Sequence, residues 1–237
     1  MKAIILAAGR GERMRPLTDT CPKPLLPLRG KPLIEWHLEA LARGGVREVV
    51  INTAWLEEQL VAALGDGARF GLTIRWSLEG RDHGGALETA GGLKKALPLL
   101  QLDGDEPFWY VAADVFAPDF RFDATTAAAL QPGELAHLWL VPNPPQHPRG
   151  DFGLAGGRLG TGTGTDADRF TWSGIGVFRP GFVHELMAAL PVGARARLRP
   201  YLDTAIAQGR LGGQLWRGAW ADVGTPERLR ALDAGAT

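Results

Sequence analysis

The residues of this chain that are best suited to chemistry lie near its start, where a glycine-rich segment follows a short apolar run. Residues 2–6, with isoleucines at their centre, are typical of a buried parallel strand. Ala8, Gly9 and Gly11 then keep side chains out of the way, so backbone N–H groups can approach an anion. Glycine also tolerates the positive φ angles that such a turn needs. The segment therefore predicts a loop that holds phosphate groups.

Positive charge follows this loop closely. Arg10, Arg13, Arg15 and Lys23 all lie within reach of it. An ordinary strand exit with a solvated basic face would also explain a glycine-arginine loop. Lys23 favours phosphate binding instead, because it stands between two prolines whose fixed φ angles present one ammonium with little freedom. Together the loop and its cations predict a site for a triphosphate.

Two aspartates have the positions expected of metal ligands. Asp114 directly follows the apolar run FWYVAA, and Asp222 follows a short run that ends before a glycine and a helix start. Taken alone, Asp114 could equally cap a turn. Two carboxylates that end two strands can hold Mg²⁺, because this ion takes few protein ligands and completes its shell with water and phosphate oxygens. We therefore expect Asp114 and Asp222 to bind Mg²⁺.

The elements that must position these residues are short apolar runs that alternate along the chain with helical patterns. This alternation indicates a sheet wrapped by helices. Strands are expected at 2–6, 46–52, 72–78, 108–113 and 170–178, and helices at 32–43, 56–64 and 89–97. Right-handed crossovers place the strands' carboxyl ends at one edge, where open α/β sheets bind ligands. The glycine loop, the glycine-rich stretch at 79–92 and Asp114 share that edge. The predicted fold is α/β, with a three-layer, Rossmann-like sheet that is mixed but mostly parallel.

Composition excludes several classes of function. The chain has 26 basic and 26 acidic residues among 237, a balance that argues against nucleic-acid binding through a broad basic surface. No apolar run is long enough for a membrane span or a signal-peptide core. The lone cysteine, Cys21, excludes an intrachain disulfide and a cysteine-based zinc cluster, and no histidine lies close in sequence to make it a nucleophile. We expect a cytoplasmic protein.

Several segments match a known family. They read LAAGRGERMRPLT, CPKPLLPLRGKPLIEWHLEAL, VINTAWL, LETAGGLKKAL and WADVGTPERL. In these segments the chain resembles the sugar-1-phosphate nucleotidyltransferases, whose signature is a glycine loop with an arginine and then a proline-flanked lysine. The resemblance implies the nucleotide-diphospho-sugar transferase fold as a single domain over 1–237, without the β-helix of longer members. It also implies a nucleotide-binding half at 1–115 and a sugar-binding half at 116–237.

The resemblance also implies a reaction. A sugar 1-phosphate would attack the α-phosphorus of a nucleoside triphosphate, giving a nucleotide sugar and pyrophosphate with Mg²⁺ as cofactor. The implied catalytic residues are Arg13, which pairs with the departing phosphates, Lys23 near the α-phosphate, and the metal ligands Asp114 and Asp222. Catalysis would then consist of positioning and charge neutralisation, because no enzyme nucleophile is required.

Base and sugar recognition are implied by the same resemblance. The implied nucleotide-binding residues are Ala8, Gly9, Gly11, Arg13, Lys23, Glu79, Leu87 and Gly91. Glu79 could accept a uracil N3–H or equally a guanine N1–H, and residues 81–84 look like an insertion in its loop. On the sugar side the implied residues are Gly150, Asp151 and Ser173. Ala113 stands where the family usually has glycine, and the loop at 156–165 replaces a familiar sugar-binding motif.

Several substrates and one other class of function remain open at this point. The short form with RGDFG is most similar to uridylyltransferases of cell-wall sugar recycling, which implies UTP and a muramic-type sugar 1-phosphate. A mannose- or glucose-1-phosphate nucleotidyltransferase using GTP, UTP or dTTP is the alternative. A regulatory protein that binds nucleotide sugars without turnover could lose any of the four catalytic residues, and this chain keeps them all. GRGERM lacks the spacing of a nicotinamide-binding loop.

Overall fold

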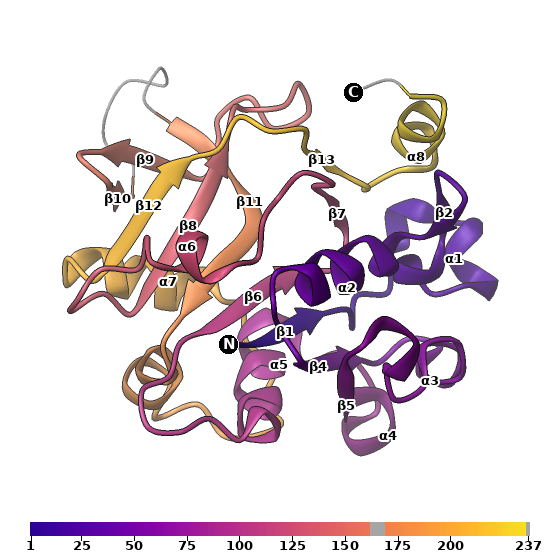
Figure 1. The fold of residues 1–237 in the computed structure, drawn as a ribbon, viewed down its shortest axis with the longest axis horizontal. Coiled ribbons are helices and arrows are strands. Elements are labelled where there is room, and N and C mark those ends of the chain that lie inside the picture. The colour runs from indigo at the N-terminus through magenta and orange to yellow at the C-terminus, as the bar shows by residue number, and fades with distance from the viewer. Residues whose placement is uncertain (162–168, 236–237) are drawn as a thin grey trace.

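The computed structural model describes residues 1–161 and 169–235. Within this part of the chain, one mixed sheet has the strand order β5-β4-β1-β6-β11-β8-β12-β10-β9 (Figure 1). Its strands are β1 (Lys2–Leu6), β4 (Glu48–Thr53), β5 (Thr73–Leu78), β6 (Phe108–Ala112), β8 (Ala136–Val141), β9 (Phe152–Ala155), β10 (Arg158–Gly160), β11 (Arg169–Phe178) and β12 (Leu211–Leu215). β11 runs antiparallel to β6, β8 and β9, and β10 runs antiparallel to β12 and β9. The remaining pairs are parallel, so the predicted mixed sheet is confirmed.

Helices and two short ladders complete the structure. The helices are α1 (Leu17–Thr20), α2 (Leu33–Arg43), α3 (Glu57–Leu64), α4 (Glu79–His83), α5 (Glu88–Ala96), α6 (Ala124–Ala127), α7 (Arg199–Ala207) and α8 (Pro226–Asp233). The ladders pair β2 (Pro27–Leu28) with β3 (Lys31–Pro32), and β7 (Val115–Phe116) with β13 (Ala221–Asp222). The strands and helices expected in the first half all form within a few residues of their predicted bounds. No helix among the described residues is long and apolar enough to cross a membrane.

Two cores lie on opposite faces of the sheet. Side chains alternate along β1, so Ile5 packs in the core that α2, α3 and α6 cover, while Ile4 packs in the core that α5 and α7 cover. Both residues are fully buried. A strand buried on both faces needs apolar residues throughout, which explains why Lys2–Leu6 has no polar alternation. Helices therefore cover both faces, and the predicted three layers are confirmed.

The chain end packs against the chain start. Leu229 and Leu232 of α8 share a third apolar cluster with Leu28 of β2. The Arg29 backbone N–H donates to Asp233 Oδ1 at 2.5 Å, and Arg29 Nε donates to the Leu232 carbonyl at 3.0 Å. In Figure 1, α8 accordingly lies beside β2, with β13 leading into it. This docking holds β13 against β7 and so determines where Asp222 lies.

The stretch after β5 differs from the expected loop, because residues 79–83 form helix α4. The Glu57 carboxylate accepts hydrogen bonds from the backbone N–H groups of Gly80 at 3.1 Å and Arg81 at 2.8 Å. These are N–H groups of the first turn, which have no partner inside the helix. A carboxylate from α3 therefore caps α4, a contact that the local sequence of 79–83 does not encode. Within the expected loop at 156–165, residues 158–160 instead form strand β10, and residues 162–165 lie outside the described residues.

Candidate active site

Three adjoining cavities follow the carboxyl ends of the parallel strands. The α3–α4 cavity, of about 1220 Å³, lies between α3, α4 and residues 193–195. The glycine-loop cavity, of about 570 Å³, is lined by residues 6–14 together with Lys23 and Asp114. The β7–β13 cavity, of about 350 Å³, is lined by residues that include Asp114 and Asp222. Ala8 and Arg195 border the first two cavities, and Arg13 and Asp114 border the last two, so the three form one trough.

The glycine loop has the open backbone that a phosphate site requires. Ala8, Gly9 and Gly11, the residues predicted to present their backbone to a nucleotide, line the glycine-loop cavity. A Cβ added at Gly9 would meet no atom within 4 Å, so that face of the loop is open to a ligand. Gly11 has φ +69°, and a Cβ there would approach Thr18 Cγ2 to 3.0 Å. Gly11 is therefore required by conformation and Gly9 by access.

The three arginines of the loop do not have equal roles. Arg10 and Arg15 each pair with Asp19 Oδ1 at 2.8 Å, and the Arg10 guanidinium also lies 3.8 Å from the centre of the Trp55 ring. Arg13 makes no hydrogen bond or ion pair with any residue in the described part of the chain. It lines both the glycine-loop cavity and the β7–β13 cavity. Arg13 is thus the arginine of this loop whose charge is available to a ligand.

Lys23 and Asp114 form an ion pair in the wall of the glycine-loop cavity, and Asp114 also lines the β7–β13 cavity. Lys23 Nζ lies 2.8 Å from Asp114 Oδ2, with side chains 10% and 51% exposed respectively. The surrounding protein partly desolvates the carboxyl and acts to raise the pKa of Asp114. The charge and hydrogen bond of Lys23 outweigh this effect, so the pKa lies below its usual value. Asp114 is therefore ionised at neutral pH.

The ladder between β7 and β13 brings the second aspartate beside the first. Asp222 pairs with Val115 across this ladder, and the Val223 backbone N–H donates to the Asp114 carbonyl at 2.8 Å. The Asp222 carboxylate also accepts hydrogen bonds from Gln146 Nε2 at 2.6 Å and from Arg228. The two predicted metal ligands therefore line one cavity, although they are far apart in sequence.

The donor set suits Mg²⁺ better than a tightly ligated metal. Asp114 and Asp222 offer hard carboxylate oxygens, which Mg²⁺ prefers. Among the described residues there is no group of three or more His, Cys, Asp or Glu side chains that could hold a metal ion. A site with two carboxylates fits an ion that keeps several waters and binds phosphate oxygens. The cations Lys23 and Arg228 hold these carboxylates in fixed positions.

Glu79 does not lie where a nucleotide base could reach it, which corrects the role expected from the sequence. Its side chain is fully buried. Oε1 accepts from Asn52 Nδ2 at 2.6 Å, and Oε2 accepts from the Leu87 backbone N–H at 2.7 Å. Burial raises the pKa of Glu79, and these two hydrogen bonds oppose that rise. Asn52 Oδ1 in turn accepts from the Ala7 N–H at 2.7 Å. Glu79 thus connects the glycine loop to the segment that begins at Leu87.

We expect Glu79→Gln to lower the free energy of unfolding by about 1–3 kcal/mol, because the amide NH₂ must face one of two donors. The Michaelis constant for the nucleotide should rise more than the turnover number falls, since the loop loses a brace and no reacting group is lost. Urea unfolding and steady-state kinetics measure both effects. Glu39→Gln is the control, because Glu39 is 38% exposed and pairs with Lys31 at the surface. Wild-type stability with an altered base preference would restore the direct-contact role.

Leu87 and Gly91 are the remaining residues expected to bind the nucleotide, and they differ in whether they border a cavity. Leu87 borders the α3–α4 cavity, and its contact with a nucleotide stays a prediction. Gly91 borders none of the three cavities, which corrects its assignment. A Cβ at Gly91 would lie 2.2 Å from the Ala194 carbonyl oxygen, so this glycine allows α5 to pack closely on the loop that contains Ala194. Its role is in packing and not in binding the nucleotide.

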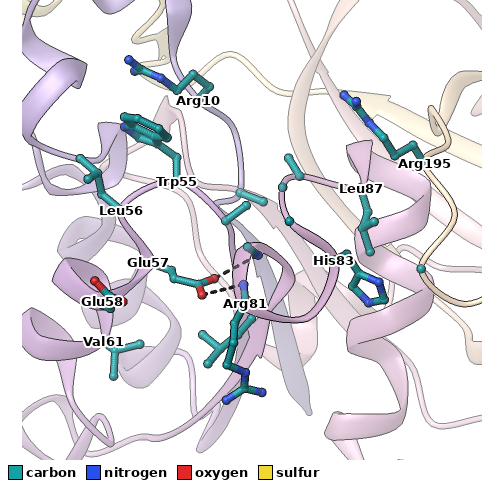
Figure 2. A pocket seen from close by; sticks show the side chains of 18 of the residues that line it. Arg10, Trp55, Leu56, Glu57, Glu58, Val61, Arg81, His83, Leu87 and Arg195 are labelled. Atoms are coloured by element: carbon teal, nitrogen blue, oxygen red, sulfur yellow. Dashed lines mark hydrogen bonds between the residues drawn. The ribbon is translucent and has the colours of Figure 1, made fainter.

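That close packing introduces a cation that sequence reasoning missed. Arg195 comes from the second half of the chain but lines both the α3–α4 and the glycine-loop cavities. Its side chain is 72% exposed, and Nη2 lies 3.8 Å from Glu88 Oε1. Figure 2 shows Arg195 and His83 across the α3–α4 cavity from Arg10 and Trp55. No local pattern around Arg195 distinguishes it from the neighbouring arginines, because only the tertiary contact places it there.

Of the three residues expected on the sugar side, Asp151 alone borders one of the three cavities. It lines the β7–β13 cavity, where Oδ1 lies 3.1 Å from His147 Nε2 and Oδ2 accepts from the Trp172 N–H at 2.8 Å. Ser173 is fully buried, and its Oγ accepts from the Ile175 N–H at 3.2 Å, which corrects its assignment. Gly150 has φ +58°, and a Cβ there would lie 2.5 Å from Asn143 Oδ1. Gly150 is a conformational residue, and it borders none of the three cavities.

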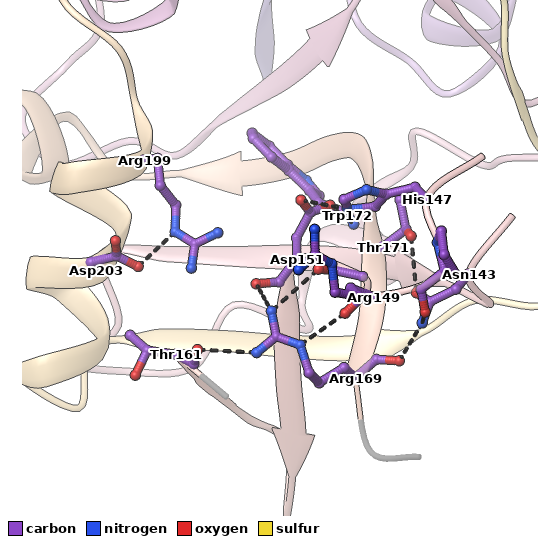
Figure 3. A network of polar contacts seen from close by, with 12 residues as sticks. Asn143, His147, Arg149, Asp151, Thr161, Arg169, Thr171, Trp172, Arg199 and Asp203 are labelled. Atoms are coloured by element: carbon purple, nitrogen blue, oxygen red, sulfur yellow. Dashed lines mark hydrogen bonds and ion pairs between the residues drawn. The ribbon is translucent and has the colours of Figure 1, made fainter. Parts of the chain in front are cut away.

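Arg169 fixes the loop that contains Asp151, another contact that the sequence did not indicate. Its guanidinium donates to the carbonyl oxygens of Arg149 at 2.8 Å, Gly150 at 3.2 Å and Asp151 at 3.1 Å. Figure 3 shows this guanidinium among the loop residues. Asp151 is thereby held at the cavity wall by contacts that do not involve its carboxylate.

Two features noted in the sequence lie near these cavities. Trp55 borders the α3–α4 cavity and Trp220 the β7–β13 cavity, whereas Trp109 and Trp139 are core residues. Ala113 borders the glycine-loop cavity but is only 2% exposed and belongs to the core that α2 covers. Its methyl group therefore packs largely inside the protein.

Comparison with known proteins agrees with this geometry. The family model described as nucleotidyl transferase matches residues 2–236. The chain belongs to this family. A relative of this nucleotidyltransferase, the N-acetylmuramate α-1-phosphate uridylyltransferase of Neisseria meningitidis, is 48% identical over 99% of the chain and 97% of its own length. A UTP–glucose-1-phosphate uridylyltransferase of Synechocystis is 40% identical over 55% of the chain and 34% of its own length.

A solved structure supports the fold of the nucleotidyltransferase. A Bacillus anthracis protein described as a glucose-1-phosphate thymidylyltransferase superposes with a TM-score of 0.80. The match covers 100% of this chain and 95% of that one, at 21% sequence identity. At this level of identity the likeness concerns the fold, which is the mixed sheet with helices on both faces.

Proposed function

We propose that this nucleotidyltransferase transfers a uridylyl group from UTP to N-acetylmuramate 1-phosphate, giving a UDP-sugar and pyrophosphate. The observation that carries the proposal is that the glycine-loop cavity and the β7–β13 cavity meet at Arg13 and Asp114. Two polyanions bound in these cavities would meet beside a cation that makes no ion pair with another described residue. The relative that is 48% identical over nearly the whole chain supports the choice of UTP and of the sugar.

The proposed reaction is an in-line displacement at phosphorus. An oxygen of the sugar phosphate forms a bond to the α-phosphorus of UTP, and the bond from that phosphorus to the bridging oxygen of pyrophosphate breaks. The attacking phosphate is already ionised near neutral pH, so the protein has to overcome charge repulsion and orient the two groups. We assign the backbone of Ala8, Gly9 and Gly11 to the nucleotide, and Lys23 to the α-phosphate region. Arg13 stabilises the departing phosphates.

Asp114 and Asp222 are the residues that would hold Mg²⁺ in this site. The bound ion would neutralise charge on the phosphate oxygens as pyrophosphate departs. Lys23 and Gln146 would keep the two carboxylates oriented. Asp151 is the candidate for a sugar hydroxyl, because it borders the β7–β13 cavity. A cytoplasmic location and a place in cell-wall sugar recycling are the natural context for these substrates.

A panel of substrates tests the proposal. Pyrophosphate release is measured with UTP, GTP, dTTP and CTP, each combined with the 1-phosphates of N-acetylmuramate, N-acetylglucosamine, glucose and mannose. We expect UTP with N-acetylmuramate 1-phosphate to give the highest kcat/KM, roughly tenfold or more above the other pairs, and EDTA to abolish the reaction. A maximum with GTP and mannose 1-phosphate would favour a guanylyltransferase. No turnover with any pair, together with tight binding of a UDP-sugar, would indicate a regulatory protein.

A further inference from the structure

His37 is a buried titratable residue to which the proposed reaction gives no role. It lies on α2 and is 2% exposed. Its Nε2 is 2.8 Å from the carbonyl oxygen of Val115. A carbonyl can only accept, so Nε2 carries the proton. Burial lowers the pKa of His37 to about 4, against the opposing effects of this hydrogen bond and of Asp114. The imidazole is therefore neutral at pH 7 and donates one hydrogen bond to Val115.

The carbonyl that His37 contacts is that of Val115, which neighbours both metal-ligand candidates. Val115 directly follows Asp114 and pairs with Asp222 across the β7–β13 ladder. The next backbone contact lies just beyond the ladder, from the Val223 N–H to the Asp114 carbonyl at 2.8 Å. A shift of β7 relative to β13 would therefore change the position of the Asp114 carboxylate relative to the Asp222 carboxylate.

The ladder itself is too short to hold this geometry. β7 and β13 each contain two residues, and an isolated two-stranded ladder is marginally stable even when it is longer. α2 supplies the missing support, because Trp36 packs edge-on against Phe116 with ring centres 5.2 Å apart. The ring of His37 is itself packed edge-on against Phe122, at 6.5 Å. α2 thus contacts both residues of β7, one through a hydrogen bond and one through an aromatic ring.

We propose that His37 is a positioning residue for the metal site. Its N–H fixes the Val115 carbonyl so that Asp114 and Asp222, the residues that would hold Mg²⁺, stay on the wall of the same cavity. The inference rests on the proposed Mg²⁺-dependent reaction for its functional meaning. Its structural part, the control of the β7–β13 ladder by His37, does not depend on that reaction.

Three variants separate positioning from general stability. His37→Leu removes the donor at similar volume, and His37→Gln keeps an N–H donor near the place of Nε2. The matched control is Leu38→Ala on the same helix. Leu38 is fully buried in the core that α2 covers and has no part in the ladder. This control lowers stability by leaving a cavity, without removing any hydrogen bond.

Two measurements do not require turnover. Titration with Mn²⁺ in the presence of UTP, followed by electron paramagnetic resonance, gives the metal dissociation constant. Hydrogen exchange of the Val223 amide reports the ladder directly. For His37→Leu we expect the Mn²⁺ dissociation constant, and the Mg²⁺ concentration for half-maximal turnover, to rise about tenfold. Val223 exchange should accelerate by a similar factor. His37→Gln should restore values near wild type, and Leu38→Ala should lower the unfolding midpoint while leaving all three unchanged.

Other results would overturn the inference. Wild-type Mn²⁺ affinity and wild-type Val223 exchange in His37→Leu would show that the ladder does not need this hydrogen bond. The same shifts in Leu38→Ala would show that they follow from lost stability alone. If His37→Leu does not fold, His37→Asn takes its place, because its shorter amide ends before the position of Nε2. If the wild-type protein needs no divalent metal, the proposed function fails, whereas Val223 exchange still decides whether His37 controls the ladder.

Discussion

Asp114→Asn is expected to reduce Mg²⁺-dependent turnover by about 10³-fold, equivalent to about 4 kcal/mol of transition-state stabilisation. Asparagine keeps the shape of the side chain but cannot supply the negative charge that a divalent ion needs. The change also leaves Lys23, whose side chain is 10% exposed, without the carboxylate that lies 2.8 Å from its ammonium. Turnover should therefore fall even at saturating Mg²⁺, which pyrophosphate release at increasing Mg²⁺ concentration would measure.

The control for this variant is Asp105→Asn. Asp105 lies just before the start of β6, whereas Asp114 follows its end. Its side chain is 61% exposed and pairs with Arg179 at 3.0 Å, away from the three cavities of the trough. Asp105→Asn should keep wild-type turnover and a wild-type thermal unfolding profile within a few degrees, and Asp114→Asn should remain folded. Asp222→Asn should lose turnover as Asp114→Asn does. Near wild-type activity in either of these two would remove that residue from the metal site.

Arg13→Ala is expected to lower kcat/KM by about 10²-fold with no loss of stability. Arg13 lines the two cavities in which the substrates are proposed to meet, and no ion pair with the described residues would be broken by its removal. The whole effect should therefore appear in kinetics. Arg13→Lys should recover part of the loss, because lysine restores the charge without the paired N–H donors of the guanidinium.

Arg15→Ala provides a matched comparison for Arg13→Ala. Arg15 is the same residue type two positions away, but it is 59% exposed and pairs with Asp19 at 2.8 Å. An exposed ion pair of this kind contributes little, so both stability and turnover should stay close to wild type. Equal losses in the two variants would mean that general positive potential assists the reaction and that Arg13 has no specific contact.

The sequence by itself determined the elements and the candidate charges. The apolar run at residues 2–6 has no polar alternation, and this pattern alone indicates a strand buried on both faces. Gly11 was predicted to sit in a tight turn, and it has φ +69°. Asp114 and Asp222 were identified because each ends an apolar run, which is a local pattern. Such features depend on residues within a few positions of one another, so they can be read without the fold.

Only the tertiary structure decided which of the candidate residues face the cavities. Glu79 is buried and accepts a hydrogen bond from Asn52, which lies 27 residues earlier in the chain. The sequence around Glu79 therefore does not show its burial. Ser173 is fully buried in the sheet. Gly91 has no side chain, which allows α5 to pack closely against Ala194. Arg13 differs from Arg15 because Asp19 neutralises only the latter of these two, although both look alike in the sequence.

The same holds for the residues that sequence reasoning missed. Arg195 reaches the glycine-loop cavity because the loop around Ala194 packs on α5. His37 contacts Val115 across 78 residues of chain. Burial and partners are properties of packing between distant segments, so no local pattern can specify them. The sequence therefore supplied the chemical groups, and the docking of distant segments determined which of them lie together in the site.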